Sequence, residues 1–236
     1  MNIYLRDRSQ VLVDAWNEVF KGHNNVKASC GDIFREGEHL DVDAIVSPAN
    51  SFGYMDGGID FVYSDYFGWG IGDILREKLW SEYDGELLVG QAVVIDMRPA
   101  AAQVKRPDGE KLRLRADRIP YLISAPTMRV PANVSNTVNA FLAFRAVLRV
   151  AKQNNFSGIL CPGLATAIGQ MPPRICAVQM FEAYRQFEKP AFYDVLGNAH
   201  QAHYAMMNAD TYIGSRPEMI DGDAKPPWKS RLPWKP

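Results

Sequence analysis

One short apolar run constrains the fold of this chain more than any other feature. The segment "VDAIVSPAN" has a continuous apolar core made of Val42, Ala44, Ile45 and Val46. A strand of this composition suits a position that is buried on both faces, which is typical of a parallel sheet. The run therefore predicts a central strand with helices packed on both sides of it.

Strand-like and helix-like segments alternate along most of the chain. Further strands are expected at 2–6, 26–34, 86–97, 120–128 and 156–164. Helices are expected from the N-cap residue Ser9 to Gly22, over 71–83 and 135–152, and after Pro172, because apolar residues recur there at helical spacing. The alternation predicts an α/β fold, a three-layer α/β/α sandwich with a mostly parallel, mixed central sheet. The polar segment 98–118 is interpreted as a surface hairpin.

The chain length of 236 residues fits one α/β domain with appendages. We assign residues 1–190 to this domain and 191–236 to a C-terminal extension. The extension begins with a helical composition and ends in a Pro- and Trp-containing tail, which holds five of the fifteen prolines. We expect the tail to pack on its own domain, because nothing in it identifies a partner.

Charge and cysteine content limit the partners and the compartment. The formal net charge of -1 gives no overall attraction for nucleic acid or anionic membranes, so an anionic ligand would have to be held locally. The three cysteines, Cys30, Cys161 and Cys176, include no close pair, which favours a reducing compartment. The N-terminus lacks the apolar centre of a signal peptide, and no run approaches the ~18 apolar residues of a membrane span. We expect a cytoplasmic protein without a membrane partner.

The first unusual loop, "SPANSFGYMDGGID" at 47–60, directly follows the buried strand. Its glycines allow backbone conformations that other residues avoid, and they allow close approach to a ligand. Asn50 supplies an amide at the end of the strand. Asp60 falls on the first turn of a possible helix, where its carboxylate could equally serve the helix dipole. A simple turn is the alternative interpretation of the loop.

The second unusual loop, "CPGLATAIGQMPP" at 161–173, also follows a buried strand. Successive backbone N–H groups in such a loop bind phosphate without a cationic side chain. The alternative is a tight strand-to-helix connection, with Pro172 and Pro173 starting the helix. Ligands of parallel sheets bind outside the carboxyl ends of the strands, so we expect both loops to face one cleft.

Other candidates are weaker. His200 and His203 could share a helix face, but no third metal ligand is placed by spacing, so we expect no metal and no cofactor. Cys161 could be a nucleophile, yet no His is positioned to activate it, and a buried cysteine at the end of a strand is commoner. A nicotinamide-dependent enzyme is disfavoured because no G-x-G-x-x-G follows the first strand. A cluster of aromatic residues follows the first loop, and most of its members should be core or cleft wall: Tyr54, Phe61, Tyr63, Tyr66, Phe67 and Trp69.

The order of three motifs resembles the macrodomain family of ADP-ribose-binding modules. These are "GDI" after an early strand, "PAN" followed by "GGID", and "PGLATAIG" after a later strand, and together they span roughly residues 26–190. The resemblance implies that Asp32 accepts a hydrogen bond from the adenine amino group. It implies that Asn50 binds the distal ribose and that Asp60 lies near its anomeric carbon. The remaining ligand contacts that it implies come from Ile33, Ala49, Gly57, Gly58, Ile59, Gly163, Leu164, Ala165, Thr166, Ala167, Ile168 and Gly169.

Two functions follow from this resemblance. The first is a hydrolase that removes ADP-ribose from a modified protein, nucleobase or small adduct by attack at C1″, with the ionised carboxylate of Asp60 orienting or deprotonating a water. The second is a reader that binds ADP-ribose without turnover. Ala165 and Ala167 favour the reader, because related loops carry glycine where close phosphate approach or a positive φ is needed. ADP-ribose or an ADP-ribosylated substrate is the expected partner, and nucleic acid is expected only as a modified substrate.

Overall fold

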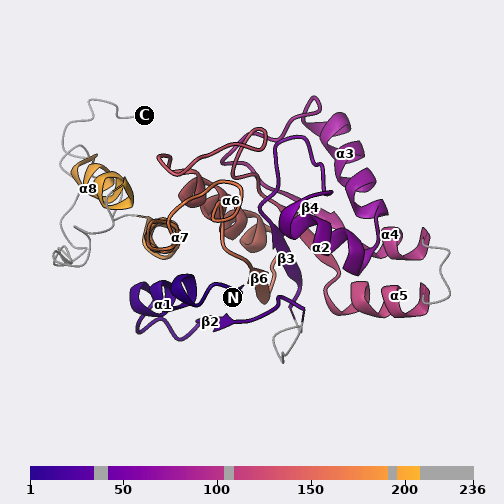
Figure 1. Cartoon of the computed structure of the whole chain (residues 1–236), viewed down its shortest axis with the longest axis horizontal. Helices are drawn as coiled ribbons and strands as arrows, with labels where there is room; N and C mark the ends of the chain where they lie inside the picture. Colours follow the sequence, from indigo (N-terminus) through magenta and orange to yellow (C-terminus); the bar gives the residue numbers. More distant parts are fainter. Residues whose placement is uncertain (35–41, 104–108, 191–195, 208–236) are drawn as a thin grey trace, which may run out of the picture.

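The sheet is mixed and has one antiparallel edge strand. A computed structural model describes residues 1–34, 42–103, 109–190 and 196–207. Within these ranges six strands form one sheet in the order β2-β1-β6-β3-β5-β4 (Figure 1). Neighbouring strands are parallel except β4 and β5, which run antiparallel. The strands are β1 Asn2–Asp7, β2 Val26–Cys30, β3 Ala44–Ser47, β4 Val93–Asp96, β5 Tyr121–Ser124 and β6 Gly158–Cys161.

Helices cover both faces of the sheet. Helices α1, α6 and α7 pack against one another on one face, and α2 to α5 lie on the other (Figure 1). The helices are α1 Gln10–Val19, α2 Gly58–Phe67, α3 Gly70–Glu82, α4 Arg98–Gln103, α5 Gly109–Arg118, α6 Asn139–Gln153, α7 Pro173–Glu188 and α8 Leu196–Met207. This arrangement confirms the predicted three-layer α/β/α fold.

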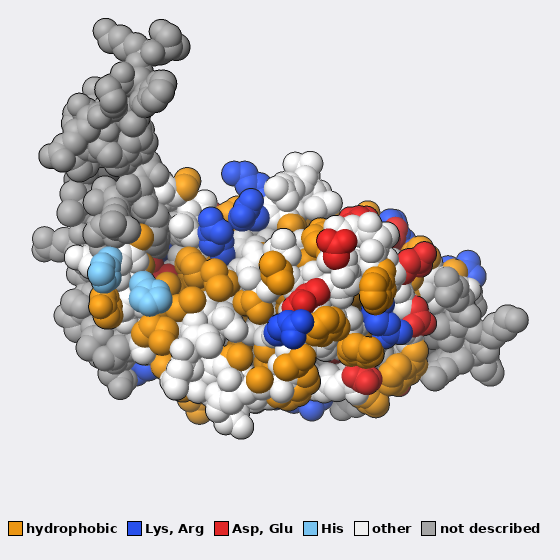
Figure 2. All heavy atoms as spheres, turned by 90° about the horizontal axis from the view of Figure 1, so that it is seen from above, with side chains coloured by type: hydrophobic (Ala, Val, Ile, Leu, Met, Phe, Trp, Pro, Cys, Tyr) orange, Lys and Arg blue, Asp and Glu red, His pale blue; other side chains and the backbone are white. Residues whose placement is uncertain are grey.

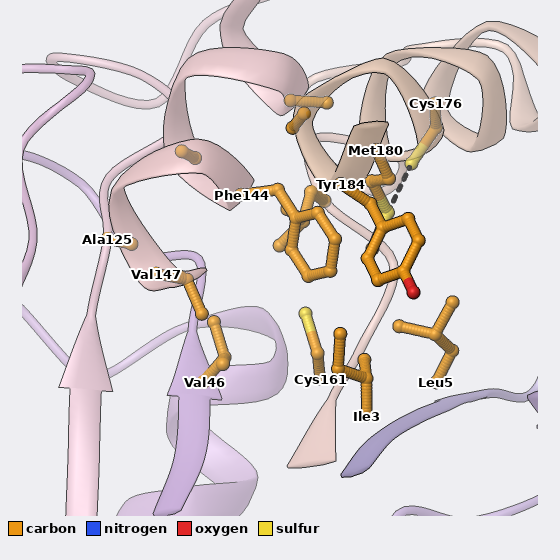
Figure 3. Packing of buried hydrophobic residues seen from close by; sticks show 14 of the residues in the cluster. Ile3, Leu5, Val46, Ala125, Phe144, Val147, Cys161, Cys176, Met180 and Tyr184 are labelled. Carbon is orange, nitrogen blue, oxygen red and sulfur yellow. Dashed lines mark hydrogen bonds between the residues drawn. The ribbon is translucent and has the colours of Figure 1, made fainter. Parts of the chain in front are cut away.

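Side chains of the central strand alternate between two hydrophobic clusters. Ala44 and Val46 of β3 belong to the cluster under α1, α6 and α7, whereas Ile45 belongs to the cluster under α2 and α3. All four residues of β3 are buried, as the apolar run predicted. Figure 3 shows the first cluster, in which Phe144 of α6 points toward Cys161 of the sheet.

Local signals placed several elements correctly. Ser9 is the N-cap of α1, and its hydroxyl accepts a hydrogen bond from the amide of Leu12. The helices expected at 71–83, 135–152 and after Pro172 are α3, α6 and α7. The strand expected at 86–97 is shorter and covers only Val93–Asp96.

The interpretation of 98–118 as a surface hairpin is wrong. The described part of this segment forms two helices, α4 and α5, that pack against each other. The residues of α5 are mostly good helix formers such as Glu, Lys, Leu, Arg and Ala, so the helix is locally favourable despite its polarity. The small side chains of Ala100, Ala101 and Ala116 are buried, which lets the two helices approach.

The expected C-terminal extension is only partly described. The helix expected after residue 190 is present as α8, which packs on the outer side of α7 (Figure 1). Ala202 and Met206 of α8 are buried. The Pro- and Trp-containing tail lies outside the described residues. No described helix is long and apolar enough to cross a membrane.

Candidate functional site

A cavity of 420 Å³ lies beyond the carboxyl ends of the parallel strands. The residues that follow β1, β2, β3, β5 and β6 all contribute to its wall, so five strands converge on it. Both unusual loops line this cavity, as expected from the sequence. The predicted site residues that the structure brings together here are Asp32, Ile33, Ala49, Asn50, Gly57, Gly58, Ile59, Asp60, Gly163, Ala165, Thr166, Ala167, Ile168 and Gly169.

One predicted contact residue lies elsewhere. The side chain of Leu164 is fully buried in the core under α1, α6 and α7, and Leu164 is not among the residues that line the cavity. The loop alternates here between a core-facing leucine and its cavity-facing neighbours Gly163 and Ala165. Leu164 therefore anchors the loop to the domain.

The loop after β6 presents a run of backbone amides to the cavity. In the described structure, the amides of residues 165–169 donate no hydrogen bond to another backbone group. The loop is closed on its other side, because the amide of Met171 donates to the carbonyl of Ala165 and the amide of Val134 donates to the carbonyl of Gly169. Ala165 has a φ of 61°, which is uncommon for a residue with a side chain. Such an array of amides suits an anion.

The N-terminus of α2 supplies a second group of amides. Its N-cap residue is Gly57, and no side chain caps the helix end. Gly57, Gly58, Ile59 and Asp60 all line the cavity. The first amides of a helix have no partner within the helix, and they carry partial positive charge. The residues of the second loop that line the cavity end at Gly169, before α7 begins at Pro173. Of the two helices that follow the unusual loops, α2 therefore contributes its N-terminus to the described cavity wall.

The carboxyl group of Asp60 is buried beside the end of β3. Asp60 is 7% exposed, and its Oδ1 accepts a hydrogen bond of 2.5 Å from Oγ of Ser47. Burial raises the pKa of Asp60 from 3.8 to about 7, although the bond from Ser47 acts in the opposite direction. Near neutral pH this group therefore exists in both protonation states, of which the ionised one is the form that the resemblance uses.

The side chain of Asn50 is used within its own loop. Its Oδ1 accepts from the amides of Phe52 at 3.0 Å and Tyr54 at 3.4 Å, and its Nδ2 donates to the carbonyl of Tyr54 at 2.9 Å. An asparagine Nδ2 carries two hydrogens, so one remains that a ligand can accept. Asn50 thus shapes the turn and keeps one donor at the cavity wall.

The end of β1 contributes residues that the sequence analysis missed. Arg6 and Arg8 line the cavity beside Asp32. Arg8 donates a hydrogen bond from Nη2 to Oδ2 of Asp32, and the amide of Phe34 donates to Oδ1 at 3.0 Å. Arg6 is 3% exposed and holds the Asp32 carbonyl through Nε at 2.7 Å. The available signal was the charged run "RDR" at the end of the first strand, at the edge where ligands bind.

The weaker candidates lie away from this cavity. Cys161 is the last residue of β6 and is fully buried, and burial raises its thiol pKa well above the usual value. His200 and His203 lie on α8, where His200 stacks on Tyr204. Among the described residues, no group of three or more His, Cys, Asp or Glu side chains could hold a metal ion.

The fold and the cavity define a class of protein: a three-layer α/β module with a ligand site at the carboxyl edge of its sheet. A family model described as "Macro-like domain" matches residues 17–188. The chain belongs to this family of macrodomains. An uncharacterized protein of Aquifex aeolicus (strain VF5) is 32% identical over 149 residues, which cover 63% of this chain and 76% of that protein.

Solved macrodomains share the fold at low sequence identity. A macrodomain variant of Oceanobacillus iheyensis solved with ADPR matches with a TM-score of 0.50 and 19% identity, covering 66% of this chain and 74% of that chain. The macrodomain of Mycobacterium tuberculosis DarG matches with a TM-score of 0.49 and 19% identity, covering 67% and 88%. At 19% identity, the likeness to the Oceanobacillus macrodomain concerns the fold alone.

Proposed function

We propose that this protein binds ADP-ribose in the cavity described above and hydrolyses its bond to a modified group. The observation that carries the proposal is the pair of amide clusters, the loop 165–169 and the N-terminus of α2, which face one cavity. A nucleotide diphosphate placed between them would gain hydrogen bonds from both sides without a lysine or arginine. The Oceanobacillus relative was solved with ADPR, which supports the same ligand class for this chain.

Asp60 is the proposed catalytic group. It lines the cavity next to the amides of α2, so a distal ribose that follows the diphosphate would lie beside it. In its ionised form the carboxylate accepts a proton from a water that attacks C1″, while the bond from C1″ to the modified group breaks. A pKa of about 7 suits this role, because a general base works best near the ambient pH.

Asn50 is the proposed orienting residue for the ribose. The Nδ2 hydrogen that its own loop does not use can donate to a ribose hydroxyl. Because the same side chain fixes the turn at 50–54, the donor is already oriented before the ligand arrives.

Calorimetry with ADP-ribose and turnover of ADP-ribosylated substrates test this proposal. We expect ADP-ribose to bind, and we expect release from proteins, nucleobases or small adducts to be lost in Asp60→Asn while ADP-ribose binding persists. Equal turnover by the wild type and Asp60→Asn would remove Asp60 from the mechanism. A wild type that binds no ADP-ribose would overturn the whole proposal.

A reader without turnover is the second candidate, and the conformation of Ala165 favours it. This residue has a left-handed φ of 61° and lines the cavity, although it is only 4% exposed and belongs to the core cluster under α1, α6 and α7. A loop backbone fixed in this conformation by a buried methyl group could hold the diphosphate away from the position that attack at C1″ requires. Tight binding of ADP-ribose together with no release from any substrate class would establish the reader.

A further inference from the structure

Three exposed aromatic residues lie next to the α2 side of the cavity. Tyr54, Phe61 and Trp69 are 55%, 48% and 47% exposed. Single exposed apolar residues are normal on a protein surface, but aromatic residues grouped beside a ligand site indicate an interaction surface. We call these three residues the aromatic rim.

The aromatic rim is continuous with the wall of the cavity. Tyr54 itself lines the cavity. Phe61 lies one helical turn beyond Gly57 and Gly58, which also line it, so these residues share one face of α2. Trp69 follows α2 and meets the ring of Phe61 edge to face, with 5.5 Å between the ring centroids. A group attached to a ligand at Asp60 would therefore leave the cavity beside the rim.

Two exposed acidic residues lie beside the aromatic rim. Asp56 lies at the cavity wall and Asp65 on α2, both are exposed, and neither forms an ion pair with a described residue. The nearby cation Arg76 is already engaged, because it pairs with Asp73 at 2.5 Å and lies over the ring of Tyr54 at 5.4 Å. Figure 2 shows acidic, basic and hydrophobic side chains intermixed over the α2–α5 layer.

A second cation of this layer contacts the C-terminal end of α2. Arg115 of α5 lies over the ring of Tyr66 at 4.4 Å and donates to the Tyr66 carbonyl at 3.2 Å. Tyr66 in turn stacks on Phe34, with 3.6 Å between the ring centroids. Arg115 is thus held in a stack near the C-terminal end of α2, the end at which Asp65 and Trp69 also lie, and its guanidinium is engaged with the ring and the carbonyl of Tyr66.

We propose that the aromatic rim, with Asp56 and Asp65, binds a Lys- and Arg-rich segment of an ADP-ribosylated protein. This inference rests on the proposed function and names its substrate class. The faces of Phe61 and Trp69 can attract cations, whereas the ring of Tyr54 already carries Arg76, and the two carboxylates strengthen the attraction. Nucleic acid fits less well, since its phosphates would approach two free carboxylates.

Two ADP-ribosylated peptides test the inference. Both carry ADP-ribose through a non-hydrolysable C1″ linkage at the same position, and they differ only in flanking residues, which are Lys- and Arg-rich in one and Glu-rich in the other. Because the linkage is stable, Kd is measured on the wild-type chain whether or not turnover occurs. We expect the basic peptide to bind about tenfold more tightly at 0.15 M salt, and this preference to shrink at 1 M, where the screening length falls to about 3 Å.

Matched variants separate the rim from general effects. The double variant Asp65→Asn/Trp69→Ala should reduce the preference to less than about twofold, which is the size expected when one cation–π contact and one charge are lost. The Kd of this double variant for free ADP-ribose should equal that of the wild type. An unchanged Kd also shows that the double variant is folded. The control Glu77→Gln/Trp80→Ala removes one exposed acid and one exposed tryptophan from α3, outside the cavity wall, and should keep the full preference.

Each outcome has a distinct meaning. Equal Kd values for the two peptides, a preference that survives in the double variant, or tighter binding of an ADP-ribosylated oligonucleotide would overturn the inference while leaving the proposed function intact. Absence of binding to free ADP-ribose by the wild type would overturn the proposed function, and this inference with it.

Discussion

The hydroxyl of Ser47 lies 2.5 Å from Oδ1 of Asp60, and both side chains are buried. Ser47 is the last residue of the central strand β3, and Asp60 belongs to the first turn of α2. The hydrogen bond therefore ties the proposed catalytic carboxyl to a fully buried strand of the sheet. It also opposes the effect of burial, because donation to the ionised form lowers the pKa that desolvation raises.

Removal of the Ser47 hydroxyl should shift the titration of Asp60. In Ser47→Ala, desolvation remains and the bond that favours the ionised form is lost, so the pKa of Asp60 should rise above its value of about 7. The pH midpoint of hydrolysis, read from kcat/KM, should move upward in parallel. Ser64→Ala is the matched control, because Ser64 is equally buried but donates to the carbonyl of Met55. An unchanged midpoint in Ser47→Ala would contradict this role.

Asp60 should make the fold less stable as the pH rises. A carboxyl whose pKa is raised on folding contributes stability that is complete below its unfolded pKa near 3.8 and is lost as the pH rises toward 7. At about 1.4 kcal/mol per pKa unit, the loss amounts to up to about 4 kcal/mol. Denaturant unfolding from pH 4 to pH 8 should show this loss in the wild type relative to Asp60→Asn, which cannot titrate.

The comparison of wild type and Asp60→Asn cancels other titrations. The pKa of Asp43 is lowered by hydrogen bonds from Ser157 and Gly158 against the opposing effect of burial, so its contribution to stability falls with acid in both proteins. Parallel pH curves for the two proteins would show that Asp60 ionises normally in the fold.

The elements that the sequence predicted correctly have strong local patterns. The apolar run of β3 and the Ser9 cap each determine their structure from a few neighbouring residues. Helix α5 was missed because its polar sequence indicated a surface hairpin. Its residues nevertheless favour a helix through their intrinsic propensity. The glycine loops were found because their composition is unusual, and the structure brings them to one cavity.

Features that depend on the sheet order could not be read from the sequence. Arg6 and Arg8 reach the cavity because β1 pairs between β2 and β6, which places its end beside the other strand ends. The burial of Asp60 depends on α2 packing over β3, so its raised pKa is a tertiary effect. The core-facing side chain of Leu164 could likewise not be read from the composition of its loop.

Replacement of Ala165 by glycine should not weaken the loop. A non-glycine residue at a φ of 61° costs about 1 kcal/mol, and glycine removes this cost while adding about 0.5–1 kcal/mol of entropy to the unfolded chain. We expect the free energy of unfolding of Ala165→Gly to change by less than about 1 kcal/mol and the affinity for ADP-ribose to stay equal or rise. Ala146→Gly, in the interior of α6, is the control and should lose about 1 kcal/mol. A clear loss of affinity in Ala165→Gly would show that the methyl group contributes to binding.

Replacement of Gly163 by alanine should displace the loop after β6. A Cβ at this position would lie 2.6 Å from Cδ2 of Leu12, 2.7 Å from Oγ1 of Thr166 and 2.8 Å from Oδ2 of Asp7, and the amide of Gly163 donates to this same Asp7 oxygen at 3.1 Å. Relief of these contacts requires the side chains of Leu12, Thr166 and Asp7 or the loop itself to shift, and such overpacking typically costs about 1–3 kcal/mol.

The same substitution at Gly72 provides the contrast. Gly72 lies in α3, where a Cβ would meet its neighbours only at ordinary contact distances of 3.7 Å, so Gly72→Ala should stabilise the fold by about 0.5–1 kcal/mol through helix propensity. Chemical denaturation and calorimetry with ADP-ribose measure both effects. We expect Gly163→Ala to lose stability and at least about tenfold in affinity, as a shift of the amides would lose more than 1.4 kcal/mol of hydrogen bonding. A loss of stability with full affinity in Gly163→Ala would contradict this prediction, because it would show that the amides of 165–169 keep their positions while the contacts around residue 163 change.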